Sequence, residues 1–196
     1  MFSLLLGCTA FLLYFLYDIN SFTRQFRIVH SFFTVGTLLL GTATVLDLWI
    51  GWKAGCYSDM VDVVLLAGAA ACFGALIYCL FFALPFQETY AEQNTGRHVY
   101  SGGVYGLCRH PGILCFFGMQ LLLGLAALPG GMIFRGLIFS LLNLLYAYFQ
   151  DRITFPKTFC DYSDYQKKVP FLIPTGASIR RIGKLLLCAE KEEEKQ

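Results

Sequence analysis

Five apolar runs, each close to the length of a membrane-crossing helix, dominate this 196-residue chain. A bilayer core about 30 Å thick requires about 20 apolar residues per helix. Polar connections separate the runs, which extend over Met1 to Tyr17, Phe32 to Ile50, Val61 to Phe86, Ile113 to Leu128, and Ile133 to Phe149. We therefore predict an all-α fold: a polytopic membrane helical bundle with about five transmembrane helices.

Composition agrees with a single integral membrane domain over residues 1–196. Hydrophobic residues make up 57% of the chain and charged residues 14%, whereas soluble domains average about 45–50% and about 25%. The 16% aromatic content excludes a disordered chain. A secreted disulfide scaffold is disfavoured because four of the eight cysteines lie inside apolar runs and resemble small buried hydrophobes. The first basic residue is Arg24, so the first run lacks a signal peptide's basic start and is expected to be retained.

Basic residues predict how the bundle is oriented. If the N-terminus is outside, thirteen of the fifteen Lys and Arg residues fall on the inner side, and only Lys53 and Arg135 on the outer. The positive-inside rule then places the C-terminus in the cytoplasm. Three N-terminal helices (1–86) precede a motif-bearing region (87–175) and a polar tail (176–196). Both long polar segments then share the cytoplasmic face, where we expect any functional site to lie. No nucleic-acid partner is predicted, because the basic residues flank membrane runs.

The first polar segment ends in Ser-Gly-Gly-Val-Tyr-Gly-Leu-Cys-Arg-His-Pro, directly before the fourth run. Glycines permit positive φ and close backbone approach to a ligand, and Pro111 suits the first turn of a helix. Free amides at this helix start, beside Arg109, would suit a carboxylate or phosphate. The alternative is a simple Gly-Gly turn, an Arg109 that reaches lipid headgroups, and His110 as an interfacial cap.

The second polar segment begins at Gln150-Asp151 and continues to a proline-rich stretch. Asp151 ends the fifth run, where its carboxylate could accept a hydrogen bond from an ammonium or ribose hydroxyl. Tyr162 and Tyr165 are three residues apart and share a helix face. In the alternative, this helix is interfacial, its tyrosines face lipid, and its lysines meet anionic headgroups.

Other sites have less support in the sequence. Neither a Cys-x-x-Cys nor a His-x-x-x-His pair is present, so no metal site is predicted. Asp47 lies near the outer end of the second run, either as a buried functional acid or, in the preferred interpretation, at the interface beside Trp49. Phosphate-binding loops, dinucleotide fingerprints and nucleophile elbows are absent from the sequence.

Taken together, the two polar segments resemble the isoprenylcysteine carboxyl methyltransferase family and its phospholipid methyltransferase relatives, which are small integral membrane enzymes. That family has a Gly-x-Tyr-x-x-x-Arg-His-Pro element before a membrane helix, matched here from Gly103 to Pro111. A later acidic pair and a Tyr-x-x-Tyr segment with a proline-rich end complete its pattern. Asp151, Tyr162 and Tyr165 correspond to these features. The match covers about residues 97 to 175.

The resemblance implies an enzyme that transfers a methyl group from S-adenosylmethionine to a lipophilic acceptor. The acceptor would be the carboxylate of a prenylated-cysteine-like group or a lipid amine, so the expected partners are lipophilic or lipidated substrates and membrane lipids. His110 and Tyr165 are the catalytic candidates that it implies. The residues expected to bind the cofactor are Gly103, Val104, Tyr105, Arg109, His110, Pro111, Asp151 and Tyr162.

The chain departs from the family pattern at two places. Gly112-Ile113-Leu114-Cys115 stands where family members have x-Tyr-x-Gly, and Gln150-Asp151 replaces a pair of glutamates. Loss of one acid weakens the expected hold on a cationic cofactor. Two other functions therefore stay open: an NADPH-dependent membrane reductase of the sterol or steroid type, and a non-catalytic relative that binds a lipid or a protein.

Overall fold

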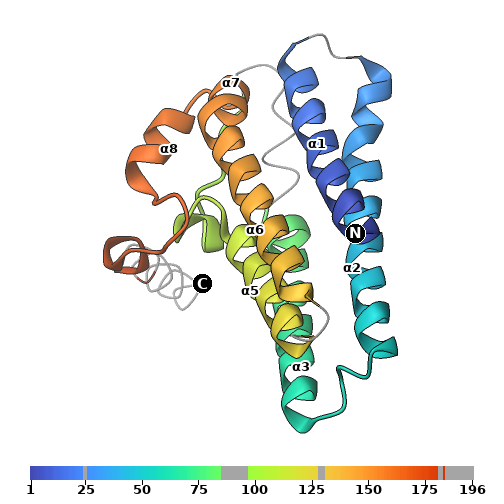
Figure 1. Ribbon diagram of the computed structural model, residues 1–196. Coiled ribbons are helices and arrows are strands. Elements are labelled where there is room, and N and C mark those ends of the chain that lie inside the picture. The colour runs from blue at the N-terminus through green and yellow to red at the C-terminus, as the bar shows by residue number, and fades with distance from the viewer. Residues whose placement is uncertain (24–25, 85–96, 128–130, 181–182, 184–196) are drawn as a thin grey trace.

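The protein is all-α, as predicted, in a computed structural model that describes residues 1–23, 26–84, 97–127, 131–180 and 183 (Figure 1). The α-helices are α1 (Phe2–Phe22), α2 (Ser31–Lys53), α3 (Met60–Ile77), α5 (Pro111–Ala126), α6 (Met132–Phe149), α7 (Phe155–Thr158) and α8 (Tyr162–Lys168). Short 3-10 helices cover Arg27–His30 and Gly103–Gly106, and π-helical turns extend α3 over Tyr78–Phe82 and α6 over Gln150–Thr154. The expected helix ends at Phe86 and Leu128 and most of the 176–196 tail lie outside the described residues.

Four of these helical segments are long and apolar enough to cross a membrane. They extend over Phe2–Phe22, Arg27–Lys53, Met60–Phe82 and Met132–Thr158. The remaining apolar run forms α5, which has only 16 residues and is shorter than a full span. The structure thus supports a membrane protein with four candidate spans and one shorter apolar helix, while the direction of insertion stays a prediction.

The long helices pack in the order α2, α1, α6, α5 and α3 (Figure 1). Phe11 of α1 and Phe139 of α6 are almost fully buried in the shared core, and the Phe11 ring meets Phe116 of α5 edge-on at 6.5 Å. A side chain at Gly7 would overlap the ring of Phe139, so the glycine is what permits this approach of α1 to α6. The core therefore joins the N-terminal helices to the two helices that flank the predicted site.

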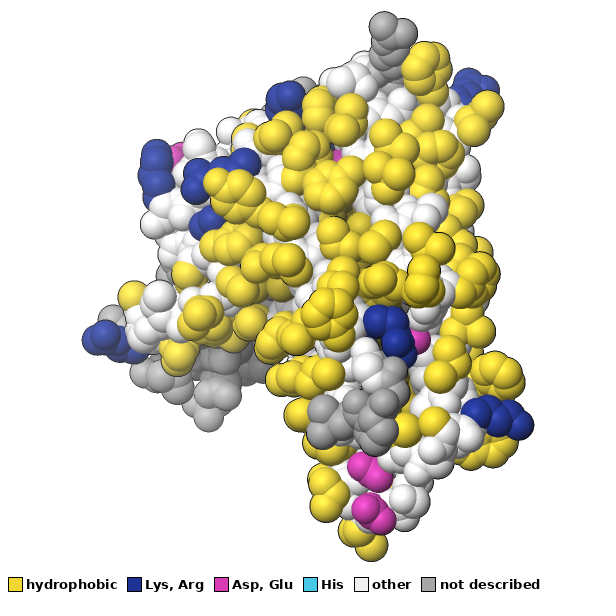
Figure 2. Space-filling view, in the orientation of Figure 1, with side chains coloured by type: hydrophobic (Ala, Val, Ile, Leu, Met, Phe, Trp, Pro, Cys, Tyr) yellow, Lys and Arg dark blue, Asp and Glu magenta, His cyan; other side chains and the backbone are white. Residues whose placement is uncertain are grey.

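Large hydrophobic side chains are exposed on the outside of the long helices. Examples are Leu5, Leu38, Val64 and Leu141, each more than half exposed. Figure 2 shows such side chains over much of the bundle, and Lys and Arg gathered over α8. An apolar exterior of this extent exceeds that of a soluble monomer and suits contact with lipid.

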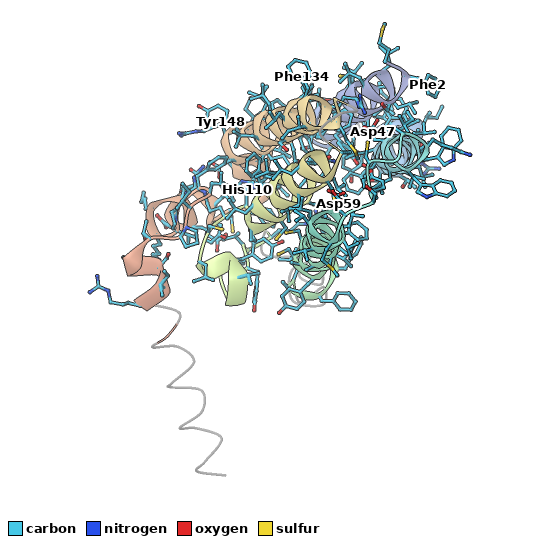
Figure 3. The ribbon with its side chains drawn as sticks, turned by 60° about the horizontal axis from the view of Figure 1, so that its bottom comes forward. Phe2, Asp47, Asp59, His110, Phe134 and Tyr148 are labelled. Carbon is cyan, nitrogen blue, oxygen red and sulfur yellow. The ribbon has the colours of Figure 1, made fainter. Side chains whose placement is uncertain are left out.

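Asp47 corrects one expectation. It is buried, not at the interface, and its Oδ1 lies 2.8 Å from Nε of Arg135 on α6. The hydroxyl of Ser3 on α1 donates to the same oxygen at 2.7 Å. The start of α1, the end of α2 and the start of α6 therefore meet at one end of the bundle, where Phe2 and Asp47 lie near each other in Figure 3.

Candidate functional site

The predicted glycine-rich turn begins at Gly103, whose φ of +50° confirms the need for a left-handed residue. Gly103 is exposed and Val104 half-buried within this 3-10 turn. Pro111 occupies the first turn of α5, as predicted. The turn and the helix start are thus formed by the residue types that the sequence led us to expect.

The two residues between this turn and α5 are joined to the C-terminal segment through the main chain. The N–H of Arg109 donates to the carbonyl of Pro170 at 2.9 Å, and that of His110 donates to Phe171 at 3.2 Å. These residues lie about sixty positions apart in the sequence, so the contact joins the two polar segments that we expected on the same face of the bundle.

Arg109 and Asp151 form a bidentate ion pair at the centre of this contact. Nε lies 2.7 Å from Oδ1, and the second nitrogen, Nη2, lies 3.0 Å from Oδ2. The remaining nitrogen donates to the carbonyls of Gln166 at 3.1 Å and Val169 at 2.5 Å. Side-chain exposure is 10% for Arg109 and 1% for Asp151. Arg109 is therefore buried in the protein and does not reach the lipid headgroups.

Asp151 receives further hydrogen bonds from α8. The hydroxyl of Tyr162 donates to Oδ1 at 2.7 Å, and the amide of Gln166 donates to Oδ2 at 3.1 Å and to the main-chain carbonyl at 2.8 Å. Burial, together with the bond to Asp151, raises the pKa of Tyr162 well above its usual range. The carboxylate is thus stabilised by groups of this chain, as a buried charge requires.

His110, labelled at the start of α5 in Figure 3, lies beside this ion pair and contacts two aromatic rings. Its ring stacks on Phe155 at 5.9 Å and meets Phe171 at 5.0 Å. Nε2 lies 3.5 Å from Oδ1 of Asp151 and has no hydrogen-bond partner among the described residues. This nitrogen faces the Asp151 carboxylate at ion-pair distance and makes no hydrogen bond within the described residues, so among the predicted site residues His110 has the least committed buried polar atom.

The tyrosines of α8 face the protein interior, so their alternative placement against lipid is wrong. Tyr162 and Tyr165 are buried, with ring centres 5.7 Å apart. The hydroxyl of Tyr165 donates to the carbonyl of Tyr105 at 2.6 Å, and the hydroxyl of Tyr105 donates to the carbonyl of Cys79 at 2.9 Å. These bonds connect α8, the glycine-rich turn and the end of α3.

The π-helical turn after α6 directs Asp151 and its neighbours to different parts of the protein. Asp151 points to Arg109, whereas Gln150 donates to Tyr146 at 3.0 Å, and Thr154 to Asp18 of α1 at 3.5 Å. Neighbouring residues of this turn thus serve different contacts. Asp151 is therefore the acid of this turn that lies at the site. Gln150, which stands in place of the family's other acid, points to Tyr146 and does not contact Arg109.

Sequence reasoning missed three residues of this cluster: Gln166, Phe155 and Phe171. Gln166 lies four positions after Tyr162, on the same helix face, and this spacing was a usable signal. The two phenylalanines carried no comparable signal, because their contacts with His110 arise only when the segments come together. A separate hollow of about 320 Å³ between α1 and the start of α2 involves none of these residues.

No protein-family model, curated protein or solved structure matches the chain. The methyltransferase resemblance therefore depends on the motif residues described above.

Proposed function

We propose that the protein is an integral membrane methyltransferase that uses S-adenosylmethionine and a lipophilic acceptor. The observation that carries the proposal is the union of the two motif segments through the Arg109–Asp151 pair. A family pattern divided between distant parts of a chain has functional meaning only if the parts meet, and these parts meet at buried polar side chains.

The contacts assign different tasks to the residues of this cluster. Arg109 and Asp151 are positioning residues, because they satisfy each other and hold α8 against the start of α5. His110 and the exposed backbone at Gly103 are the parts left to face a cofactor or an acceptor. Tyr165 is a weaker proton acceptor than His110 because a neutral phenol is a far weaker base than an imidazole, and its hydroxyl serves as a donor to Tyr105.

S-adenosylmethionine would supply a sulfonium methyl group, and its transfer to a carboxylate breaks one S–C bond, forms one O–C bond and releases no proton. For such an acceptor, this chain's contribution is alignment of the acceptor oxygen with the methyl carbon. A lipid amine must also lose a proton, and the imidazole of His110 is our candidate to receive it.

Calorimetry with S-adenosylmethionine on the full-length protein in detergent tests the proposal. We expect wild type and the matched control His30→Ala, which alters an exposed histidine, to bind, and His110→Ala to bind more weakly. Absence of binding by folded wild type at millimolar cofactor would overturn the proposal. NADPH is titrated in parallel, and binding of NADPH instead would indicate the reductase.

One observation favours the non-catalytic alternative. Both carboxylate oxygens of Asp151 accept hydrogen bonds from this chain, as they would in a purely structural pair that supports a lipid- or protein-binding surface. The same titrations separate the two functions, because a non-catalytic relative binds neither cofactor while remaining folded.

A further inference from the structure

Three side chains with metal-binding atoms meet beside the cluster, where residues 97–99 lie against residues 159–161. Nδ1 of His98 lies 3.2 Å from Oδ2 of Asp161 and 3.6 Å from Sγ of Cys160. One donor atom from each residue lies within 4.8 Å of the others. The histidine is separated from the other two residues by more than sixty positions, which explains why no sequence motif marked the group.

The main chain holds this group together without help from a ligand. Arg97 and Phe159 form an isolated parallel bridge, and the N–H of Cys160 donates to the carbonyl of Arg97 at 3.0 Å. The N–H of Val99 donates to Oδ1 of Asp161 at 2.9 Å. This bond orients the carboxylate so that its other oxygen faces His98, as partner groups orient ligands in metal sites.

The spacing of the donor atoms suits a tetrahedral metal ion. Zinc bonds of about 2.0–2.2 Å to nitrogen and oxygen and about 2.3 Å to sulfur place neighbouring ligand atoms about 3.4 Å (N and O) and about 3.6 Å (N and S) apart. The observed separations of 3.2 and 3.6 Å are close to these values. Because a thiolate disfavours magnesium and calcium, we infer that His98, Cys160 and Asp161 bind a zinc ion, with water in the fourth position.

A Cys-His-Asp nucleophile is the competing interpretation, and the geometry disfavours it. In such a triad the acid contacts one ring nitrogen and the nucleophile contacts the other. Here Nδ1 is the ring nitrogen close to Asp161, and Sγ lies at similar distances from both ring nitrogens, 3.6 Å from Nδ1 and 3.8 Å from Nε2. The thiol is therefore not paired with Nε2 opposite the acid, as a triad requires, and a rotation of the His98 ring would be enough to direct Nδ1 toward an ion shared with Cys160 and Asp161.

Zinc at this position would stabilise the region that carries the motifs. Val99 and Phe159 pack against the buried side chains of Tyr162, Tyr165 and Val169. The ion would fasten the segment before the glycine-rich turn to the segment before α8, whichever reaction the protein performs. Binding would release the thiol proton of Cys160 to solvent, so affinity should rise with pH.

The test uses untagged full-length protein in detergent, dialysed against zinc, with metal content measured by mass spectrometry. Wild type should bind one equivalent, and Cys160→Ser and His98→Gln should bind more than about tenfold more weakly. Cys56→Ser is the control, because Cys56 is a partly exposed thiol in the connection between α2 and α3 and lies outside both the group and the candidate spans. Cobalt in place of zinc should give thiolate charge-transfer absorption that Cys160→Ser abolishes and Cys56→Ser retains.

Alkylation of the wild type keeps the inference testable if a variant fails to fold. Zinc should protect Cys160 from a maleimide and leave the labelling of Cys56 unchanged, as read from the labelled peptides. Zinc should also raise the thermal midpoint of wild type but not of Cys160→Ser. Wild type without stoichiometric zinc, undiminished binding by Cys160→Ser, or equal labelling of Cys160 with and without zinc would each overturn the inference.

Discussion

Two buried arginine–aspartate pairs lie at the two ends of the bundle, and they differ in what surrounds them. Arg135 and Asp47 connect helices directly, with Ser3 as a further donor. Arg109 and Asp151 also hold segments outside the long helices, through Gln166 and several main-chain carbonyls. The first pair joins helix ends, whereas the second assembles a polar region around the start of a helix.

The difference shows that a buried ion pair does not by itself indicate a functional site. Both pairs have short distances, of 2.8 and 2.7 Å, and both aspartates are nearly inaccessible. What distinguishes the Asp151 pair is the adjacent His110, whose ring contacts Phe155 and Phe171, and the donors that α8 adds to the carboxylate. The surroundings of the charges therefore carry the functional argument.

Asp151→Asn should have the largest effect on stability. It leaves the Arg109 guanidinium buried without its counter-charge, which costs about 3–5 kcal/mol in buried pairs. The apparent free energy of unfolding in detergent measures this loss. If Asp151→Asn lowers the free energy of unfolding no more than Asp47→Asn does, the two ion pairs contribute equally to stability, which would contradict the difference drawn between them.

Tyr162→Phe should cost about 2–3 kcal/mol, because it removes one hydrogen bond to a buried carboxylate and keeps the ring. The raised pKa of Tyr162 adds a signature in pH. Above the ordinary tyrosine value of 10.0, the unfolded phenol ionises while the folded one stays protonated, so stability falls as pH rises. Unfolding measured on both sides of pH 10 should show a shallower fall in Tyr162→Phe, and an unchanged slope would contradict the burial of this hydroxyl.

Asp47→Asn should cost about 1–2 kcal/mol, between the values of exposed and fully buried pairs. Arg135 is 16% exposed, so part of its charge can reach solvent when its partner is neutralised. Binding of S-adenosylmethionine, measured by calorimetry, should be unchanged because the pair lies at the opposite end. Weaker cofactor binding by this variant would show that the two ends of the bundle are energetically coupled and would contradict a purely structural role for the Asp47 pair.

Gly103→Ala should have the smallest effect, about 1 kcal/mol, from a side chain forced to a φ of +50°. A Cβ at this position meets no atom within 4 Å, so the cost is conformational and not steric. Thermal unfolding measures the loss. The matched control is Gly41→Ala on α2, a helical glycine with equal space around it, which should be neutral or slightly stabilising.

Most of the fold follows from the apolar runs, because membrane thickness sets the length of a spanning helix and the polar residues around each run mark where it begins and ends. Helix starts at Phe2, Met60 and Met132 lie within a residue of the predicted ones. The sequence also drew Arg109, Asp151 and Tyr162 into one site, and the structure brings these residues together. Their expected role in binding a cofactor stays a prediction, because their polar atoms bond to one another.

What could not be predicted depends on contacts between distant segments. The sequence does not show that Asp47 lies beside Arg135, so its charge is expected at the membrane interface. The apolar runs do not indicate which face each helix turns toward its neighbours. In the same way, His98 lies far from Cys160 in sequence, so spacing rules for metal ligands cannot detect them. Local sequence patterns predict helices, whereas contacts between polar side chains can be identified only when the packing of the helices is known.

The short α5 has a consequence for the lipid around it. Sixteen residues rise about 24 Å, less than the hydrocarbon thickness of about 30 Å. A bilayer meeting this helix must thin locally or let headgroups descend along it. Arg109 and His110 directly precede α5, so such hydrophobic mismatch would bring headgroups close to the segment that carries the candidate site, while the Arg109 side chain itself stays buried in the protein. An amphiphile would then have a shorter path to this segment within its own leaflet. The length of the acyl chains, which sets the thickness of the bilayer, would then change how readily an amphiphile reaches this segment without any change in the protein.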